Sequence, residues 1–235
     1  MNALSTLVEA VVERPEAEGR TLALLVMKDG ATEIEWYGTS PTTLFAGGEQ
    51  VTEATTLISW SMAKSITHAL LGIAMVDGLL DVNDPAPFAP LQAEGQPPMR
   101  WIDLLEMRSG LTFVEDYEDA SVSHCLEMLF SGEEHRGVAD MGMYAATLGR
   151  EFRPGEHWSY ASGTTNILCR MLGDILAGGD VASVGAEKRK NAIEQFAKER
   201  LFGPIGTSSP IMKFDATGTF VGSSFVYATA RDFAT

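Results

Sequence analysis

A serine and a lysine stand three residues apart in the segment WSMAKSITHAL, residues 60–70. The hydroxyl of Ser61 becomes a nucleophile when a base takes its proton, and a neutral amine such as that of Lys64 is able to do so. A protonated lysine is costly to desolvate and accepts no hydrogen bond. Because the residues that follow are mostly apolar, we predict that the Lys64 amine is held beside the Ser61 hydroxyl for nucleophilic catalysis.

The spacing of this pair fits a helix. Residues i and i+3 share one helical face, with Cβ atoms about 5–6 Å apart, so the amine of Lys64 reaches the hydroxyl of Ser61. Backbone N–H groups at a helix N-terminus also favour negative charge on that hydroxyl. The motif alone is weak, because 16 serines and 6 lysines in 235 residues give about 0.4 chance matches. A serine helix cap or an exposed i,i+3 pair is the alternative.

A second group able to move protons stands far downstream. Tyr160-Ala161-Ser162 follows the turn sequence Arg153-Pro154-Gly155 and precedes an apolar stretch. A tyrosinate is a base for a serine hydroxyl, although a tyrosine in a turn more commonly packs its ring. The two motifs, in this order and each followed by an apolar helical stretch, predict one catalytic site more strongly than either motif alone.

A β-hairpin and a helical block would position these groups. Asp29-Gly30 between two β-rich runs is typical of a type I′ hairpin turn, and apolar spacings of three and four predict a helix from Ser61 to about Gly78. We expect GDVASVGAEKRK, residues 179–190, to be an exposed loop. Further helices are expected at residues 3–13, within 101–111, at 121–130, 138–148, 166–177 and 191–202, and from about residue 225.

Short strands followed by helices indicate an α+β class rather than a doubly wound sheet. We expect an antiparallel sheet flanked by helices together with an all-α region, in a single domain over residues 1–235. The sheet hairpin would occupy about residues 20–46 and the mainly helical region about residues 61–202.

The composition excludes several classes of function. The formal net charge is −15, from 32 acidic and 17 basic residues, so nucleic acid and anionic membranes are poor partners. No apolar run approaches the length of a membrane span, and the acidic N-terminal segment does not resemble a signal peptide. Cys125 and Cys169 match no metal-ligand spacing, and we expect both to be buried thiols. The predicted compartment is the cytoplasm.

Four segments together resemble the penicillin-recognising serine hydrolases: WSMAKSITHALLGIAMVDGLL, WIDLLEMRSGL, FRPGEHWSYASGTTNIL and FVGSSFVYATARDFA. That superfamily includes class C β-lactamases, D-alanyl-D-alanine carboxypeptidases, family VIII carboxylesterases and 6-aminohexanoate-dimer hydrolases. The resemblance covers most of residues 20–235 and implies a β-lactamase/transpeptidase-like fold. By motif, Ser61 would be the nucleophile and Tyr160 the general acid/base. Lys64 would be the base or the group that keeps Tyr160 deprotonated, and the sequence leaves both roles open.

This chain departs from the family pattern in two ways. Ser162 stands where β-lactamases commonly carry asparagine; we assign it to substrate binding and favour ester or linear-amide hydrolysis over β-lactam turnover. The late Lys-Thr-Gly or His-x-Gly strand is missing, because the only match, His135-Arg136-Gly137, precedes Tyr160 in a charged stretch. We therefore expect the chain to be C-terminally incomplete, without the last strands and without the second oxyanion donor.

The resulting hypothesis is a serine hydrolase that acts through an acyl-enzyme on a small-molecule ester or amide. It needs no metal or cofactor, and the sequence does not fix its oligomeric state. The alternative is a non-catalytic β-lactamase-like fragment or ligand-binding relative; within enzymes, it is a β-lactamase or a D-Ala-D-Ala carboxypeptidase. The histidines show no metal-ligand spacing. We expect the acidic patch of Glu115, Asp116, Glu118 and Asp119 to be a solvated loop, with a loop that rims the cleft as the alternative.

Overall fold

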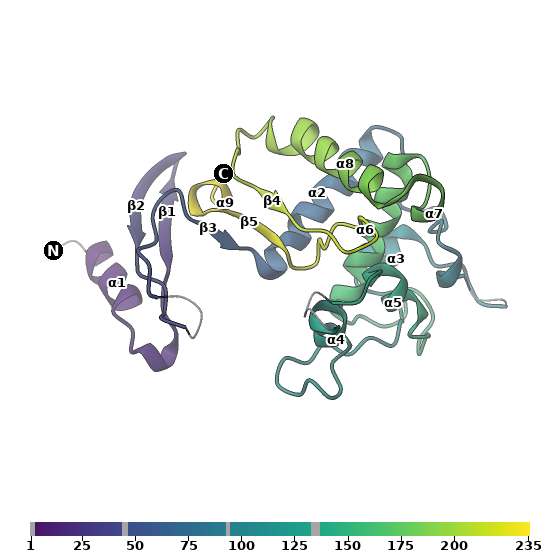
Figure 1. Ribbon diagram of the computed structural model, residues 1–235, viewed down its shortest axis with the longest axis horizontal. Coiled ribbons are helices and arrows are strands. Elements are labelled where there is room, and N and C mark those ends of the chain that lie inside the picture. The colour runs from purple at the N-terminus through teal and green to yellow at the C-terminus, as the bar shows by residue number, and fades with distance from the viewer. Residues whose placement is uncertain (1–2, 44–46, 93–94, 133–136) are drawn as a thin grey trace. The chain divides into compact units, whose positions relative to one another are not determined.

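The computed structural model describes residues 3–43, 47–92, 95–132 and 137–235 (Figure 1). The chain forms two compact units. The smaller unit contains Met1–Ile58, Thr207–Pro210 and Tyr227–Thr235, and the larger contains Ser59–Gly206 and Ile211–Val226. The expectation of a single domain over residues 1–235 stays a prediction.

The smaller unit contains the predicted hairpin. Strands β1 (Ala23–Lys28) and β2 (Ala31–Tyr37) pair antiparallel, with Val26 opposite Ile34. The turn residues Asp29 and Gly30 have φ values of 51° and 77°, which is the left-handed backbone that a type I′ turn requires. The prediction from Asp29-Gly30 is therefore confirmed. Helix α1 (Ala3–Val12), also predicted, and a 3₁₀ turn (Glu16–Glu18) precede the hairpin.

A second strand pair in this unit was not predicted. Strand β3 (Thr56–Ile58) pairs antiparallel with β5 (Val226–Thr229), with Thr56 opposite Thr229 and Ile58 opposite Tyr227. The sequence analysis expected a helix from about residue 225, but β-branched and aromatic side chains favour a strand where a partner is available. The helix begins only at α9 (Ala230–Phe233), where the Thr229 hydroxyl accepts a hydrogen bond from the Asp232 N–H.

The larger unit is mainly helical, as predicted. Helix α6 (Ser162–Ala177) buries nearly all of its residues and packs against α2, α3, α5 and α8 (Figure 1). The core of the larger unit includes the fully buried side chains of Leu70, Trp101 and Ile167. The other elements of this unit are α2 (Ala63–Val76), α3 (Trp101–Leu105), α4 (His124–Phe130), α5 (Met141–Thr147), α7 (Val181–Val184), α8 (Ala186–Ala197), β4 (Ile211–Met212), 3₁₀ turns at Trp60–Met62 and Ala89–Leu91, and a π-helical turn at Lys198–Phe202.

The segment at residues 179–190 is not the exposed loop that its charge pattern predicted. Asp180 caps α7 by accepting a hydrogen bond from the Ser183 N–H, and α8 begins at Ala186. Arg189 is completely buried, and its Nε lies 2.9 Å from Asp174 Oδ1. A charged residue is buried only when it is paired, and that pairing depends on tertiary contacts that no local pattern reports.

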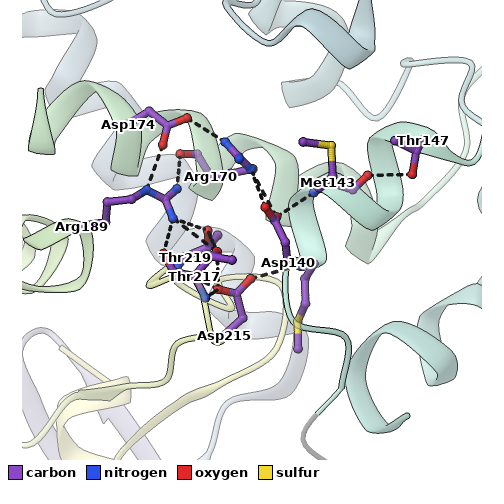
Figure 2. Close-up of polar contacts among 10 residues, drawn as sticks. Asp140, Met143, Thr147, Arg170, Asp174, Arg189, Asp215, Thr217 and Thr219 are labelled. Carbon is purple, nitrogen blue, oxygen red and sulfur yellow. Dashed lines mark hydrogen bonds and ion pairs between the residues drawn. The ribbon is translucent and has the colours of Figure 1, made fainter. Parts of the chain in front are cut away.

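Figure 2 shows the polar network around Arg189. Arg189 donates to Asp174 and to the Thr219 hydroxyl at 3.0 Å, and Arg170 lies between Asp174 at 2.8 Å and Asp140 at 3.1 Å. These contacts join α5, α6 and α8 to the turn that leads into residues 219–226. Removing one partner of such a buried pair typically costs about 3–5 kcal/mol, so the network fixes the position of that turn.

None of the helices in the described ranges combines the length and the apolar character that crossing a membrane requires.

Candidate active site

Ser61 lies in a 3₁₀ turn, Trp60–Met62, immediately before α2. The helix was expected to begin at Ser61 itself. The turn differs from that expectation because Trp60 has a φ of 44°, which is uncommon for a bulky residue and marks a strained backbone. The Ser59 hydroxyl holds the turn: its single hydrogen is within reach of the Trp60 and Ser224 carbonyls, at 3.0 and 3.2 Å, and its oxygen accepts from the Val226 N–H at 3.1 Å.

The Lys64 amine lies at the centre of the site. Its Nζ is 3.1 Å from Ser61 Oγ, 3.0 Å from Ser162 Oγ and 3.0 Å from the Ser223 carbonyl oxygen. The contact with Ser61 that the i,i+3 spacing predicted is therefore confirmed. Only 7% of Lys64 is exposed, so these three oxygens replace the water that an exposed ammonium group would bind.

The Tyr160 ring lies beside the Lys64 amine. Lys64 Nζ is 4.7 Å from the centre of the Tyr160 ring, within the range of a cation–π contact. Tyr160 is 39% exposed, so it is accessible to a ligand at this site. The structure thus brings together both motifs, although they are separated by almost one hundred residues.

Ser162 is held by a carboxylate that the sequence analysis placed in a solvated loop. Glu115 accepts hydrogen bonds from the Ser162 N–H at 2.5 Å and from the Ser162 hydroxyl at 2.9 Å. The Tyr117 hydroxyl also donates to Glu115. Of the acidic patch, Asp119 and Glu118 are exposed as expected, but Glu115 is half-buried against Ser162.

These bonds give the Ser162 hydroxyl a defined orientation. Because it donates its hydrogen to Glu115, its lone pairs face the Lys64 amine. Ser162 is 1% exposed, and its described contacts are with the protein itself. Its assignment to substrate binding stays a prediction.

The sequence analysis named the segment that carries Ser223 only as part of the family resemblance and assigned no role to Ser223. Gly222 allows this backbone to pack closely, because an added Cβ would lie 2.2 Å from Thr67 Oγ1 and 2.5 Å from Cys169 Sγ. The Ser223 N–H donates to Asn166 Oδ1 at 3.2 Å, while its carbonyl accepts from Lys64. The GSS sequence is a weak signal for this role, since a backbone carbonyl contributes no side-chain motif.

The other candidate residues lie outside this group. The His124 ring accepts a hydrogen bond from the Val114 N–H, and His157 stacks on Phe152. His135 and Arg136 lie outside the described residues. The residues that the structure does describe contain no cluster of three or more His, Cys, Asp or Glu side chains suited to a metal ion.

The two cysteines are buried and free, as predicted. Burial raises the pKa of the Cys125 thiol to about 11 and that of the Cys169 thiol to about 12. Both therefore remain protonated at neutral pH, and a protonated thiol is a poor nucleophile. Ser61 is accordingly the better placed nucleophile in this region.

If this group of residues hydrolyses esters, the substitution Glu115→Gln should lower kcat about 10- to 100-fold with little change in KM. An amide can accept on one side only, so the Ser162 hydroxyl loses its charged acceptor; hydrogen bonds to charged groups contribute about 1.5–3 kcal/mol. Steady-state ester hydrolysis measures both constants. Glu118→Gln, an exposed carboxylate of the same loop, is the matched control and should retain wild-type kinetics. Unchanged kcat in Glu115→Gln would exclude a positioning role for Glu115.

Comparison with known proteins gives a consistent result. The family profile described as Beta-lactamase matches residues 6–234. No curated protein sequence matches the chain. Among solved structures, one described as a 6-aminohexanoate-dimer hydrolase from Bacillus anthracis has a TM-score of 0.68 at 19% sequence identity, over 93% of this chain and 53% of that one.

Two further structures are similar in the same way. The octameric penicillin-binding protein homologue from Pyrococcus abyssi has a TM-score of 0.63 at 15% identity, over 99% of this chain and 55% of that one. A class C beta-lactamase from Rhodobacter sphaeroides has a TM-score of 0.59 at 19% identity, over 100% of this chain and 64% of that one. The predicted α+β, β-lactamase/transpeptidase-like fold is thereby confirmed. The chain spans between 53% and 64% of the length of these three structures.

Proposed function

We propose that this chain, which belongs to the beta-lactamase family, is a serine hydrolase that cleaves carboxylic esters or linear amides through an acyl-enzyme. The observation that carries this proposal is the position of the Lys64 amine between Ser61 Oγ, at 3.1 Å, and Ser162 Oγ, at 3.0 Å. Such an arrangement pairs a nucleophile with a base whose own position is fixed by a third group.

In the first step, the Ser61 oxygen attacks the substrate carbonyl carbon, and the hydroxyl proton of Ser61 passes to the Lys64 nitrogen. When Lys64 is protonated, its three hydrogens can be donated to the three oxygens around it; when it is neutral, its lone pair can face Ser61 Oγ and accept that hydrogen. The contacts with Ser162 and Ser223 keep the amine in place in both states. Lys64 is thus suited to act as the general base.

In the second step, the tetrahedral intermediate expels an alcohol or an amine, which must gain a proton. We assign that transfer to Tyr160, because its ring lies beside the Lys64 amine and is partly exposed. The backbone N–H of Ser61, in the turn before α2, is proposed as one donor to the oxyanion. Water then releases the acid from Ser61 by the same proton transfers in reverse.

The preference for esters and linear amides rests on Ser162. Its short hydroxyl has no amide group with which to bind a β-lactam side chain, and it is already bonded to Glu115 and Lys64. A solved structure of similar fold is described as a 6-aminohexanoate-dimer hydrolase, which fits a linear amide. A β-lactamase, a D-Ala-D-Ala carboxypeptidase and a non-catalytic ligand-binding relative are the alternatives.

Intact-mass spectrometry after exposure to substrates distinguishes these functions. We expect p-nitrophenyl esters and a linear amide with an uncharged acyl chain to be turned over, with a transient mass increase equal to one acyl group, and a penicillin to be turned over slowly or not at all. Rapid penicillin turnover would assign the chain to the β-lactamases. A complete absence of acylation by every compound would favour the non-catalytic alternative.

We also propose a cytoplasmic location, which the two buried free thiols support because disulfides are rare there. The net charge of −15 supports the proposal that neither nucleic acid nor an anionic membrane is a partner.

A further inference from the structure

A cavity of about 350 Å³ opens beside Ser61. Its volume is within the lower range of small-molecule sites. Apart from the hydroxyl groups of two serines and a tyrosine, its lining side chains are hydrocarbon or indole. The lining residues are Trp60, Ser61, Tyr117, Leu126, Leu129, Phe130 and Ser224.

The Trp60 and Phe130 rings of this lining form an aromatic cluster with Phe225, the residue after Ser224. The Trp60 ring lies 5.9 Å from Phe225 and 6.5 Å from Phe130, and Phe130 lies 6.2 Å from Phe225, measured between ring centres. Trp60 is nevertheless 51% exposed and Phe130 38% exposed. Large apolar side chains that remain accessible next to a reactive group provide a surface for an apolar ligand.

The position of the cavity relative to the proton-transfer groups indicates which part of a substrate enters it. The leaving group must lie near Tyr160, which would protonate it. Among the described residues that line the cavity, neither Tyr160 nor Lys64 occurs. Because Ser61 lines the cavity and these two proton-transfer groups do not, we assign the cavity to the acyl chain rather than to the leaving group.

The charge of the described lining residues indicates which acyl chains this cavity can bind. No Asp, Glu, Lys or Arg is among the described lining residues. A carboxylate or ammonium group on the acyl chain would lose its water without gaining a partner, which is strongly unfavourable. An uncharged hydrocarbon chain would instead bury its surface against the aromatic rings.

We propose that this cavity is the acyl pocket of the enzyme and that it selects esters or amides of uncharged, apolar carboxylic acids. This inference rests on the proposed function, because it requires Ser61 to be acylated. It adds the substrate class that the catalytic residues alone do not determine.

A series of p-nitrophenyl esters tests the proposal on the chain of residues 1–235. From acetate through butyrate to hexanoate, kcat/KM should rise about threefold to fourfold for each added methylene, the factor expected for burying one CH₂ group. The esters of succinic acid and 6-aminohexanoic acid, which place a charge on the acyl chain, should react at least 10-fold more slowly than the neutral ester of similar length.

Two substitutions of Phe130 test whether this cavity causes the dependence of kcat/KM on acyl chain length. Phe130→Ala should flatten the dependence of kcat/KM on acyl chain length, and Phe130→Trp should shorten the preferred chain. Phe152→Ala is the matched control, because Phe152 is also 38% exposed but does not line this cavity. It should leave the chain-length dependence unchanged.

The outcomes separate this inference from the proposed function. If Ser61 is acylated but kcat/KM is independent of chain length, or is highest for a charged acyl group, the acyl pocket is wrong and the serine hydrolase stands. If no ester, including acetate, acylates Ser61, both proposals fail. A chain-length effect that Phe152→Ala removes and Phe130→Ala does not would also overturn the assignment of the pocket.

Discussion

Replacing Ser61 by alanine is expected to lower kcat for ester hydrolysis by about 10⁶-fold, the effect seen when a hydrolase loses its nucleophile. Alanine leaves no oxygen to bond to the acyl carbon, so a fluorophosphonate or an activated ester should no longer add to the protein. The effect is expected on chemistry rather than on folding, because the Ser59 hydroxyl independently holds the turn before α2. Hydrolysis rates and intact mass after labelling measure the two losses.

Ser65 provides the matched control for this variant. It lies in α2, four residues after Ser61, and is exposed, so Ser65→Ala should retain both labelling and turnover. Peptide mapping of the wild-type adduct gives an independent check. A label found on Ser59, Ser65 or Ser162 in place of Ser61 would show that the proposed nucleophile is wrong.

The substitution Lys64→Arg is expected to lower kcat by about 10²- to 10⁴-fold, the usual contribution of a general base. A guanidinium group keeps its proton, so it can still donate to the Ser162 hydroxyl and the Ser223 carbonyl but cannot accept a hydrogen from Ser61. The comparison therefore removes proton transfer while retaining positive charge. Steady-state rates with a p-nitrophenyl ester, together with the temperature of unfolding, measure the effect.

A lysine outside the candidate site provides the control for replacing lysine by arginine. The Lys190 side chain is 40% exposed, and Lys190→Arg should retain wild-type activity. If Lys64→Arg turns over substrate at the wild-type rate, Lys64 is not the base and Tyr160 is the remaining candidate. If Lys64→Arg unfolds at a markedly lower temperature, Lys64→Gln, which removes the charge with a shorter side chain, separates the structural effect from the catalytic one.

The part of the site that the sequence predicted is the part with a local geometric cause. Ser61 and Lys64 are close because helical residues three apart share a face. The Asp29-Gly30 turn was predictable for a similar reason, since positive φ values restrict which residues can occupy it. The first strand pair and most helices of the larger unit followed from spacing of this kind. The link between Lys64 and Ser162 needed a family resemblance, because no local rule relates residues so far apart.

The part that the sequence did not predict depends on tertiary contacts. Glu115 is one of four acidic residues between positions 115 and 119, and nothing in that run distinguishes the carboxylate that contacts Ser162 from those of the exposed Glu118 and Asp119. Arg189 lies in a charged stretch typical of an exposed loop, yet it is fully buried because Asp174 and Thr219 meet it there. Ser223 contributes a backbone carbonyl, which is chemically the same in every residue.

The bond between Lys64 and the Ser223 carbonyl has a consequence for how the site forms during synthesis. The two residues are separated by 159 positions, and the Ser59 hydroxyl, two residues before Ser61, accepts a hydrogen bond from the Val226 N–H across 167 positions. Contacts of such long sequence separation form late and slow folding, because a large loop must close first. At about 5–20 residues per second, the ribosome needs roughly 8–30 s to add the residues that lie between Lys64 and its acceptor. During that interval the nascent chain carries Ser61 and Lys64 without the Ser223 carbonyl that fixes the amine, so the arrangement of the candidate site is acquired only after the segment at residues 219–226 has left the ribosome and packed against α2 and α6.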